Sequence, residues 1–172
     1  MKKGYVQVYT GDGKGKTTAA LGLALRAAGA GLKVYICQFM KTGNYSEIKA
    51  LKRFSDLISI EQFGTGKFVK GLPAPEDMAA ARSGFEKARR AMASGQYGLI
   101  ILEEANVAVH FGLFSVEELL NLIADKPEGL EIIITGRGAR PEIIDRADLV
   151  TEMKSIKHYF DKGVAARTGI EK

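Results

Sequence analysis

The N-terminal region carries the residues whose types and spacing most clearly indicate chemistry. They are Gly11-Asp12-Gly13-Lys14-Gly15-Lys16-Thr17, followed by Thr18. Closely spaced glycines let the backbone turn tightly, so that successive N–H groups converge on phosphate oxygens. Lys16 would add a positive charge to the phosphates, and Thr17 a hydroxyl ligand for a divalent cation. We therefore predict that residues 11–18 bind ATP together with Mg²⁺ or Mn²⁺.

The flanking sequence supports this interpretation of the glycine-rich loop. A strand-like segment at 5–9 precedes it, and a helix-like segment at 15–28 follows it, as a phosphate-binding loop (P-loop) requires. One departure is Thr10, which stands where the general pattern has its first glycine. The alternative is a capped, glycine-rich turn with no ligand, which the strand and helix context disfavours.

A pair of carboxylates is the second candidate element. The apolar run 99–102 ends in Glu103 and Glu104, and a P-loop protein commonly holds its metal with an acidic residue at the end of another strand. Both residues are Glu rather than the usual Asp, so the sequence leaves open which of them is nearer the metal. Two solvated carboxylates at a strand end are the alternative.

Apolar and helical segments alternate along the chain and must position these residues. Apolar runs lie at 5–9, 33–39, 57–60, 99–102, 130–135 and 149–150, with helical spacing at 15–28, at 76–93 and after a capping box at Ser115. This alternation predicts an α/β fold, a mostly parallel sheet flanked by helices, in one domain spanning residues 1–172. The site should then lie at the carboxyl ends of the strands, with the loops 41–46 and 64–75 beside it.

Composition narrows the setting of the protein. The chain has 172 residues, of which 46% are hydrophobic and 26% charged, and its net charge is +5. It has no stretch long and apolar enough to span a membrane, and its single cysteine, Cys37, has no partner for an intramolecular disulfide. We therefore expect a cytoplasmic protein without a membrane partner. His110 and His158 stand far apart without cysteines beside them, which argues against a transition-metal site.

Several segments together resemble one family, the P-loop type of ATP:corrinoid adenosyltransferases. They are Thr10–Gly22, Gln38-Phe39-Met40-Lys41, Thr135-Gly136-Arg137-Gly138, 147–153, 157–158, 162–163 and 169–171. The family loop also lacks the first glycine, and it usually has Asn where this chain has Asp12. The resemblance covers essentially the whole chain and implies a P-loop NTPase (RecA-like) fold.

The resemblance also implies a reaction. A Co(I) corrinoid attacks the 5′ carbon of ATP and expels triphosphate, so the loop holds a leaving group in a nucleotide that lies reversed relative to ordinary NTPases. Lys16, Glu104 and Arg137 are the implied catalytic residues, and Thr17, Glu103 and Glu104 the metal ligands. No protein nucleophile is needed, because cobalt supplies it.

Corrinoid contacts follow from the same resemblance. The residues expected to contact the corrinoid are Gln38, Lys41, Phe63, Phe68 and His158. Family members commonly carry a Gly-Phe-x-Trp loop that crowds the lower face of the corrinoid, but this chain contains no Trp. Phe63 and Phe68 are the available substitutes. The resemblance further implies a homodimer, and a reductase is the expected source of Co(I).

Some interpretations stay open at this stage. The alternative function is a RecA-like, nucleic-acid-stimulated ATPase, which needs a basic stripe with stacking aromatics. Lysine and arginine are scattered with no run longer than two, so we expect no nucleic-acid partner. A nucleotide-dependent regulatory switch is the third reading. Asn106 either lines the pocket or ends the strand, and His110 is interpreted as a structural residue.

Overall fold

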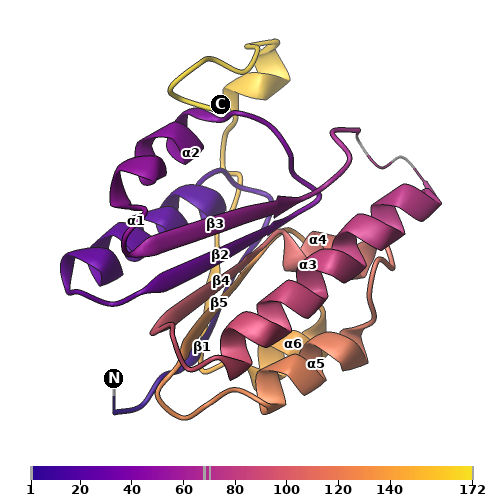
Figure 1. Ribbon diagram of the computed structural model, residues 1–172. Coiled ribbons are helices and arrows are strands. Elements are labelled where there is room, and N and C mark those ends of the chain that lie inside the picture. The colour runs from indigo at the N-terminus through magenta and orange to yellow at the C-terminus, as the bar shows by residue number, and fades with distance from the viewer. Residues whose placement is uncertain (1, 68, 70, 172) are drawn as a thin grey trace.

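A six-stranded sheet forms the centre of the computed structural model, which describes residues 2–67, 69 and 71–171 (Figure 1). Its strands are β1 (Val6–Thr10), β2 (Val34–Phe39), β3 (Ile58–Phe63), β4 (Leu99–Glu103), β5 (Glu131–Thr135) and β6 (Leu149–Glu152). Their order across the sheet is β3-β2-β4-β5-β1-β6, and every neighbouring pair is parallel. The predicted α/β class is confirmed.

Helices cover both faces of the sheet, as Figure 1 shows. One face carries α1 (Lys16–Gly29) and α2 (Ser46–Leu51), and the other carries α3 (Pro75–Ala93), α4 (Ala105–His110), α5 (Val116–Ala124) and α6 (Pro141–Arg146). Two short 3₁₀ helices, η1 (Lys52–Phe54) and η2 (Tyr159–Lys162), complete the secondary structure. The capping box predicted at Ser115 is present, because its hydroxyl accepts from the backbone N–H of Glu118. None of the helices described has the length and apolar character needed to cross a bilayer.

The central strands are apolar on both sides because both sides are covered. In β5, Ile132 and Ile134 pack with the core beneath α3 to α6, whereas Ile133 packs with the core beneath α1. This explains why the sequence shows continuous apolar runs rather than alternation. β6 differs, since all four of its residues are exposed at the edge of the sheet, including Leu149 and Val150.

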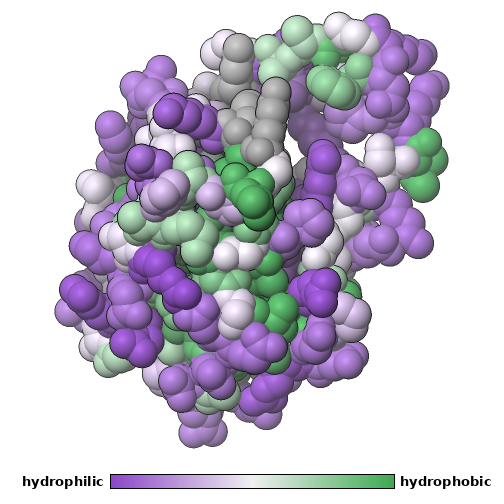
Figure 2. All heavy atoms as spheres, turned by 90° about the vertical axis from the view of Figure 1, so that its right-hand side faces the viewer, coloured by the Kyte–Doolittle hydropathy of each residue, from purple (hydrophilic) through white to green (hydrophobic). Residues whose placement is uncertain are grey.

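All six strands end at the same edge because they run parallel. The phosphate loop follows β1 there, the pair Glu103 and Glu104 ends β4, Arg137 follows β5, and the C-terminal segment 153–171 follows β6. Figure 2 faces this side and shows apolar side chains reaching the surface in its middle, with hydrophilic ones around them. The fold therefore gathers the predicted chemistry at one edge.

Candidate active site

The phosphate loop is closed by the chain that follows β6. The N–H of Gly13 donates to the carbonyl of Met153 at 2.6 Å, and a Cβ added to Gly11 or Gly13 would lie 2.5 or 2.7 Å from that carbonyl oxygen. Gly11 and Gly15 also have φ of 92° and 122°, in the left-handed region that favours glycine. The glycines are thus required both for the turn and for the close approach of Met153.

Lys16 turns back into its own loop. Its ammonium donates to the carbonyls of Gly11 and Gly13 at 2.6 and 2.7 Å. Burial, and secondly the positive charge of Arg137, lower the pKa of Lys16, while Glu104 and Asp12 act in the opposite direction. The ammonium of Lys16 is therefore desolvated and lies where the loop would receive phosphate oxygens. It can exchange the two carbonyls for those oxygens when phosphate binds.

A buried network connects the loop to β2 and β4 through Glu103, whose side chain is only 1% exposed. One carboxylate oxygen accepts from the hydroxyl of Thr17 at 2.6 Å and from the ammonium of Lys41 at 2.5 Å. The other accepts from the amide of Gln38, which in turn accepts from Gln62 at 2.9 Å. Every member has a partner, so the network fixes the position of Glu103 and Thr17.

Gln38, which was predicted to contact the corrinoid, is part of the buried network. Its side chain is fully buried and donates to the carboxylate of Glu103. The reason is the strand order, which sets β2 directly beside β4 and pairs Gln38 with Glu103 in register. Gln38 therefore orients the carboxylate of Glu103.

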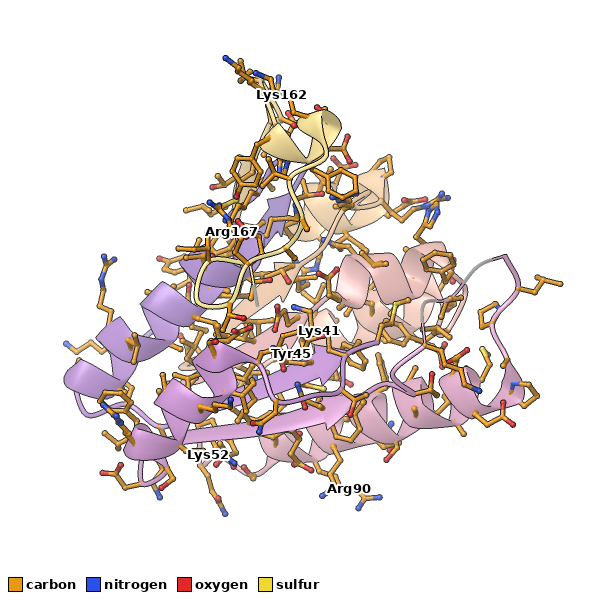
Figure 3. All side chains as sticks on the ribbon, turned by 90° about the horizontal axis from the view of Figure 1, so that it is seen from above. Lys41, Tyr45, Lys52, Arg90, Lys162 and Arg167 are labelled. Atoms are coloured by element: carbon orange, nitrogen blue, oxygen red, sulfur yellow. The ribbon has the colours of Figure 1, made fainter. Side chains whose placement is uncertain are left out.

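Lys41 follows β2 and brings a positive charge to the centre of the site, beneath the C-terminal segment (Figure 3). Its ammonium lies 3.5 Å from the hydroxyl of Thr17 as well as close to Glu103. Burial would lower the pKa of Lys41, but the carboxylate of Glu103, together with those of Glu104 and Glu47, outweighs this effect and raises it above its ordinary value. Lys41 is therefore a charged partner of the carboxylates.

Glu104 sits in a strained backbone conformation. Its φ of 60° is left-handed, which a residue with a side chain rarely adopts, and it lies between β4 and α4. Its N–H donates to the hydroxyl of Thr135 at 3.1 Å, which ties it to the end of β5. Burial, opposed first by Lys41 and reinforced by Glu103, raises the pKa of the Glu104 carboxyl. Strain and desolvation at one residue are typical of functional sites.

The donor set at this edge fits Mg²⁺. Thr17 offers a hydroxyl hydrogen-bonded to Glu103, and Glu104 offers a second, largely desolvated carboxylate near Lys41, Lys16 and Arg137. Mg²⁺ in nucleotide sites takes one or two carboxylates or hydroxyls and completes its shell with phosphates and waters. Within residues 2–67, 69 and 71–171, no cluster of three or more His, Cys, Asp or Glu side chains forms a cage for a softer metal.

An exposed network joins the other side of the phosphate loop to the C-terminus. Lys14 donates to the hydroxyl of Tyr159 at 3.0 Å and to Glu171 at 2.8 Å. Arg167 binds Glu171 at 3.1 Å and lies 5.0 Å from the centre of the Tyr159 ring. Hydrogen bonds from Arg167, and then from Lys14, hold the pKa of the Glu171 carboxyl well below its usual range. The C-terminal segment thus lies over the loop.

Sequence reasoning missed the roles of Tyr159, Arg167 and Glu171. The last twenty residues show little periodicity, and these contacts join Lys14 to residues 145 and 157 positions away. The one available signal was the resemblance of 169–171 to the family's C-terminal segment.

The remaining predicted phosphate residues lie around the loop. Asp12 and Thr18 are exposed at its surface, and Arg137 is exposed beyond the end of β5, near enough to affect Lys16 electrostatically. Asn106 lies in α4 and is fully buried, so it does not end the strand; its amide nitrogen donates to the carbonyl of Gly136 at 3.3 Å. It thereby ties α4 to the loop that carries Arg137.

The predicted corrinoid residues are not brought into one cluster. Phe63 ends β3 with its ring against α3, where a Cβ on Gly84 would approach the ring to 2.7 Å. His158 caps η2, since its Nδ1 accepts from the N–H of Phe160 at 3.1 Å, and its ring contacts Tyr159. Phe68 lies outside the described residues. His110 ends α4, where its ring packs edge to face on Phe111.

Comparison with known proteins gives a consistent result across the chain. The model of the family ATP:corrinoid adenosyltransferase BtuR/CobO/CobP matches residues 2–171. The corrinoid adenosyltransferase of Pseudomonas aeruginosa is 34% identical over 171 residues, which cover 99% of this chain and 84% of that protein. The Escherichia coli enzyme of the same name is 36% identical, and the Salmonella typhimurium corrinoid adenosyltransferase CobA 34%, each with 99% of this chain and 86% of the relative covered. This chain therefore belongs to the ATP:corrinoid adenosyltransferase family.

Proposed function

We propose that this protein transfers the 5′-deoxyadenosyl group of ATP to the Co(I) of a reduced corrinoid, in adenosylcobalamin biosynthesis or salvage. The electron pair of Co(I) forms the cobalt–carbon bond, the C5′–O bond breaks, and triphosphate leaves with that bond's electrons. The observation that carries the proposal is the phosphate loop with its Thr17 and Glu103 network, in a chain that matches the family over residues 2–171. The alternative of a nucleic-acid-stimulated ATPase is not favoured.

The basic residues around the loop suit a leaving triphosphate. Lys16 exchanges its two loop carbonyls for phosphate oxygens, and Lys14 and Arg137 add charge from either side. Negative charge grows on the triphosphate as the C5′–O bond breaks, so fixed cations aimed at it lower the barrier. Positioning and electrostatics are then all the protein must supply, because the nucleophile is the cobalt.

We propose that Thr17, Glu103 and Glu104 hold Mg²⁺, or Mn²⁺ in its place. When bound there, the ion would neutralise phosphate charge. Of the two carboxylates, Glu104 is proposed as the closer ligand, since Glu103 is already engaged by Thr17, Lys41 and Gln38. Gln38 and Lys41 then act by holding Glu103 in place.

On the corrinoid side, Phe63, Phe68 and His158 stay candidates for contact with the macrocycle. The apolar surface in the middle of the carboxyl edge in Figure 2 suits a large, partly apolar substrate. Residues 1–172 are proposed to act as one domain, as a cytoplasmic homodimer. Cobalt reaches the Co(I) state by reduction, so a reductase must supply the electrons before transfer.

Spectroscopy with chemically reduced cobalamin tests the proposal. We expect purified protein with ATP and Mg²⁺ to convert the Co(I) spectrum into that of a light-sensitive adenosylcorrinoid. Omitting ATP, or adding excess chelator, should stop the conversion. ATP binding without any adenosylcorrinoid would overturn the proposal, and hydrolysis stimulated by DNA or RNA would revive the alternative. Sedimentation equilibrium checks the dimer separately.

A further inference from the structure

The loop between β3 and α3 is joined at its base by one carboxylate, that of Asp77 in the first turn of α3. One oxygen of Asp77 accepts from the hydroxyl of Thr65 at 2.6 Å, and the other accepts from the N–H of Ala74 at 3.1 Å. The contact with Ala74 is a common cap of a helix N-terminus. The contact with Thr65 is not needed to cap a helix, because Thr65 lies at the opposite end of the loop. Asp77 therefore closes the loop.

The start of this loop packs on the segment after β2 that carries Lys41. The N–H of Met40 donates to the carbonyl of Phe63 at 2.9 Å, and a Cβ added to Gly64 would lie 2.5 Å from the backbone nitrogen of Lys41. Met40 has a left-handed φ of 57°, which a residue with a side chain rarely adopts. The ammonium of Lys41 belongs to the buried network of the site. The loop is thus connected to that network through tight backbone contacts.

The position of the loop in the fold indicates which substrate it serves. The phosphate loop follows β1, whereas this loop follows β3, at the far end of the strand order β3-β2-β4-β5-β1-β6. A small pocket at its base is lined by the apolar side chains of Met40, Phe63 and Leu113, with Thr65 and Asp77 also in its wall. Apolar side chains suit the corrinoid better than a triphosphate.

We propose that Asp77 and Thr65 are positioning residues that hold the loop in the place where it borders the corrinoid. This inference rests on the proposed function and names residues that set its affinity for the second substrate. Neither residue touches the reacting cobalt or C5′ atoms. A loop that is closed beforehand loses little conformational freedom when the corrinoid binds, whereas an open loop must be ordered at that moment. The two residues therefore act on KM for the corrinoid and not on ATP.

Thr65→Val separates closure of the loop from capping of the helix. It removes the hydroxyl at nearly constant volume and leaves the contact between Asp77 and Ala74 in place. With chemically reduced cobalamin, KM for the corrinoid should rise about fivefold, the usual weight of one hydrogen bond. The values of kcat and of KM for ATP should not change. Thr65→Ser keeps the hydroxyl and should restore the KM for the corrinoid.

Asp77→Ala should act in the same direction with a larger effect. It removes both contacts, so KM for the corrinoid should rise about tenfold. The matched control is Glu76→Ala, since Glu76 is exposed in the same turn of α3 and its loss removes the same charge from the helix N-terminus. Glu76→Ala should change neither KM.

Amide hydrogen exchange in residues 64–74, measured without substrates, supplies a readout that does not depend on activity. Exchange should be faster in Thr65→Val than in Thr65→Ser. Unchanged exchange, an unchanged KM for the corrinoid, or a rise in KM for ATP in its place would overturn the inference. Failure of the unmodified protein to adenosylate cobalamin would overturn the proposed function and the corrinoid role of the loop with it, while hydrogen exchange would still show whether Thr65 closes the loop.

Discussion

Two polar networks flank the phosphate loop, and they differ in burial. The first joins Thr17, Glu103 and Lys41 inside the fold, and the side chain of Glu103 is 1% exposed. The second joins Lys14 to Glu171 at the surface, where the lysine side chain is 41% exposed. The first is built on strands of the central sheet, whereas the second depends on the segment after β6.

This difference separates a fixed part of the site from an exchangeable one. Breaking a buried ion pair leaves an uncompensated charge and is costly, whereas an exposed pair contributes little because water and salt replace it. The buried network can therefore hold the proposed metal ligands in position before substrate arrives. The exposed one can release Lys14 to a triphosphate at small cost.

The largest effect on activity is expected at Lys16, which lies in the phosphate loop between the two networks. Lys16→Ala removes the cation from the loop and should lower kcat/KM for ATP by about 1000-fold, because we propose that this charge stabilises the leaving triphosphate. Quenched adenosylation assays measure the fall in kcat/KM. Isothermal titration calorimetry shows whether the affinity for ATP falls as well. Lys52→Ala, at an exposed site in η1, is the control and should be normal. Unchanged activity of Lys16→Ala would refute the phosphate assignment.

Glu104→Gln should have the next largest effect, on the Mg²⁺ dependence of activity. The strained position of Glu104 is retained by glutamine, but the amide is a poor Mg²⁺ ligand, so the Mg²⁺ concentration needed for half-maximal activity should rise about 100-fold. Its unfolding free energy should stay within about 0.5 kcal/mol of that of the unmodified chain. A larger Mg²⁺ effect from Glu103→Gln than from Glu104→Gln would reverse the assignment of the closer ligand.

Lys41→Met tests the rigidity of the buried network. It leaves Glu103 buried without its cation, while Thr17 and Gln38 still donate to it, so the free energy of unfolding should fall by about 3 kcal/mol. Urea denaturation measures the change. The double variant Lys41→Met with Glu103→Gln should recover part of the loss, because it removes the unpaired charge. If Lys41→Met alone were as stable as the unmodified chain, the buried network would not depend on the ion pair between Lys41 and Glu103.

The smallest effect on stability should come from the exposed network. Glu171→Gln removes the negative partner of Lys14 and Arg167, and unfolding should change by less than about 0.5 kcal/mol. Amide hydrogen exchange in residues 155–171 should nevertheless become faster, since the segment loses its contacts with the loop. Glu152→Gln, which removes an exposed pair with Lys154, is the control. Equal exchange in both variants would show that Glu171 does not hold the segment.

The two networks also differ in how far the sequence could predict them. The phosphate loop and the carboxylates at the end of β4 were predictable from the sequence because each is a local pattern between a strand and its neighbouring turn or helix. The position of Gln38 was not, since its burial depends on β2 lying beside β4, which no local pattern encodes. The contact of Lys14 with Glu171 joins residues 157 positions apart, and the polar C-terminal segment gives no periodic signal of it.

The phosphorus-containing product of a single turnover tests the central claim most directly. Protein in excess over ATP, with Mg²⁺ and chemically reduced corrinoid, is quenched after one turnover and examined by ³¹P NMR. The account predicts intact triphosphate in an amount equal to the adenosylcorrinoid formed, because the bond that breaks is C5′–O. ADP and orthophosphate as the primary products, with adenosine still attached to phosphate, would contradict it.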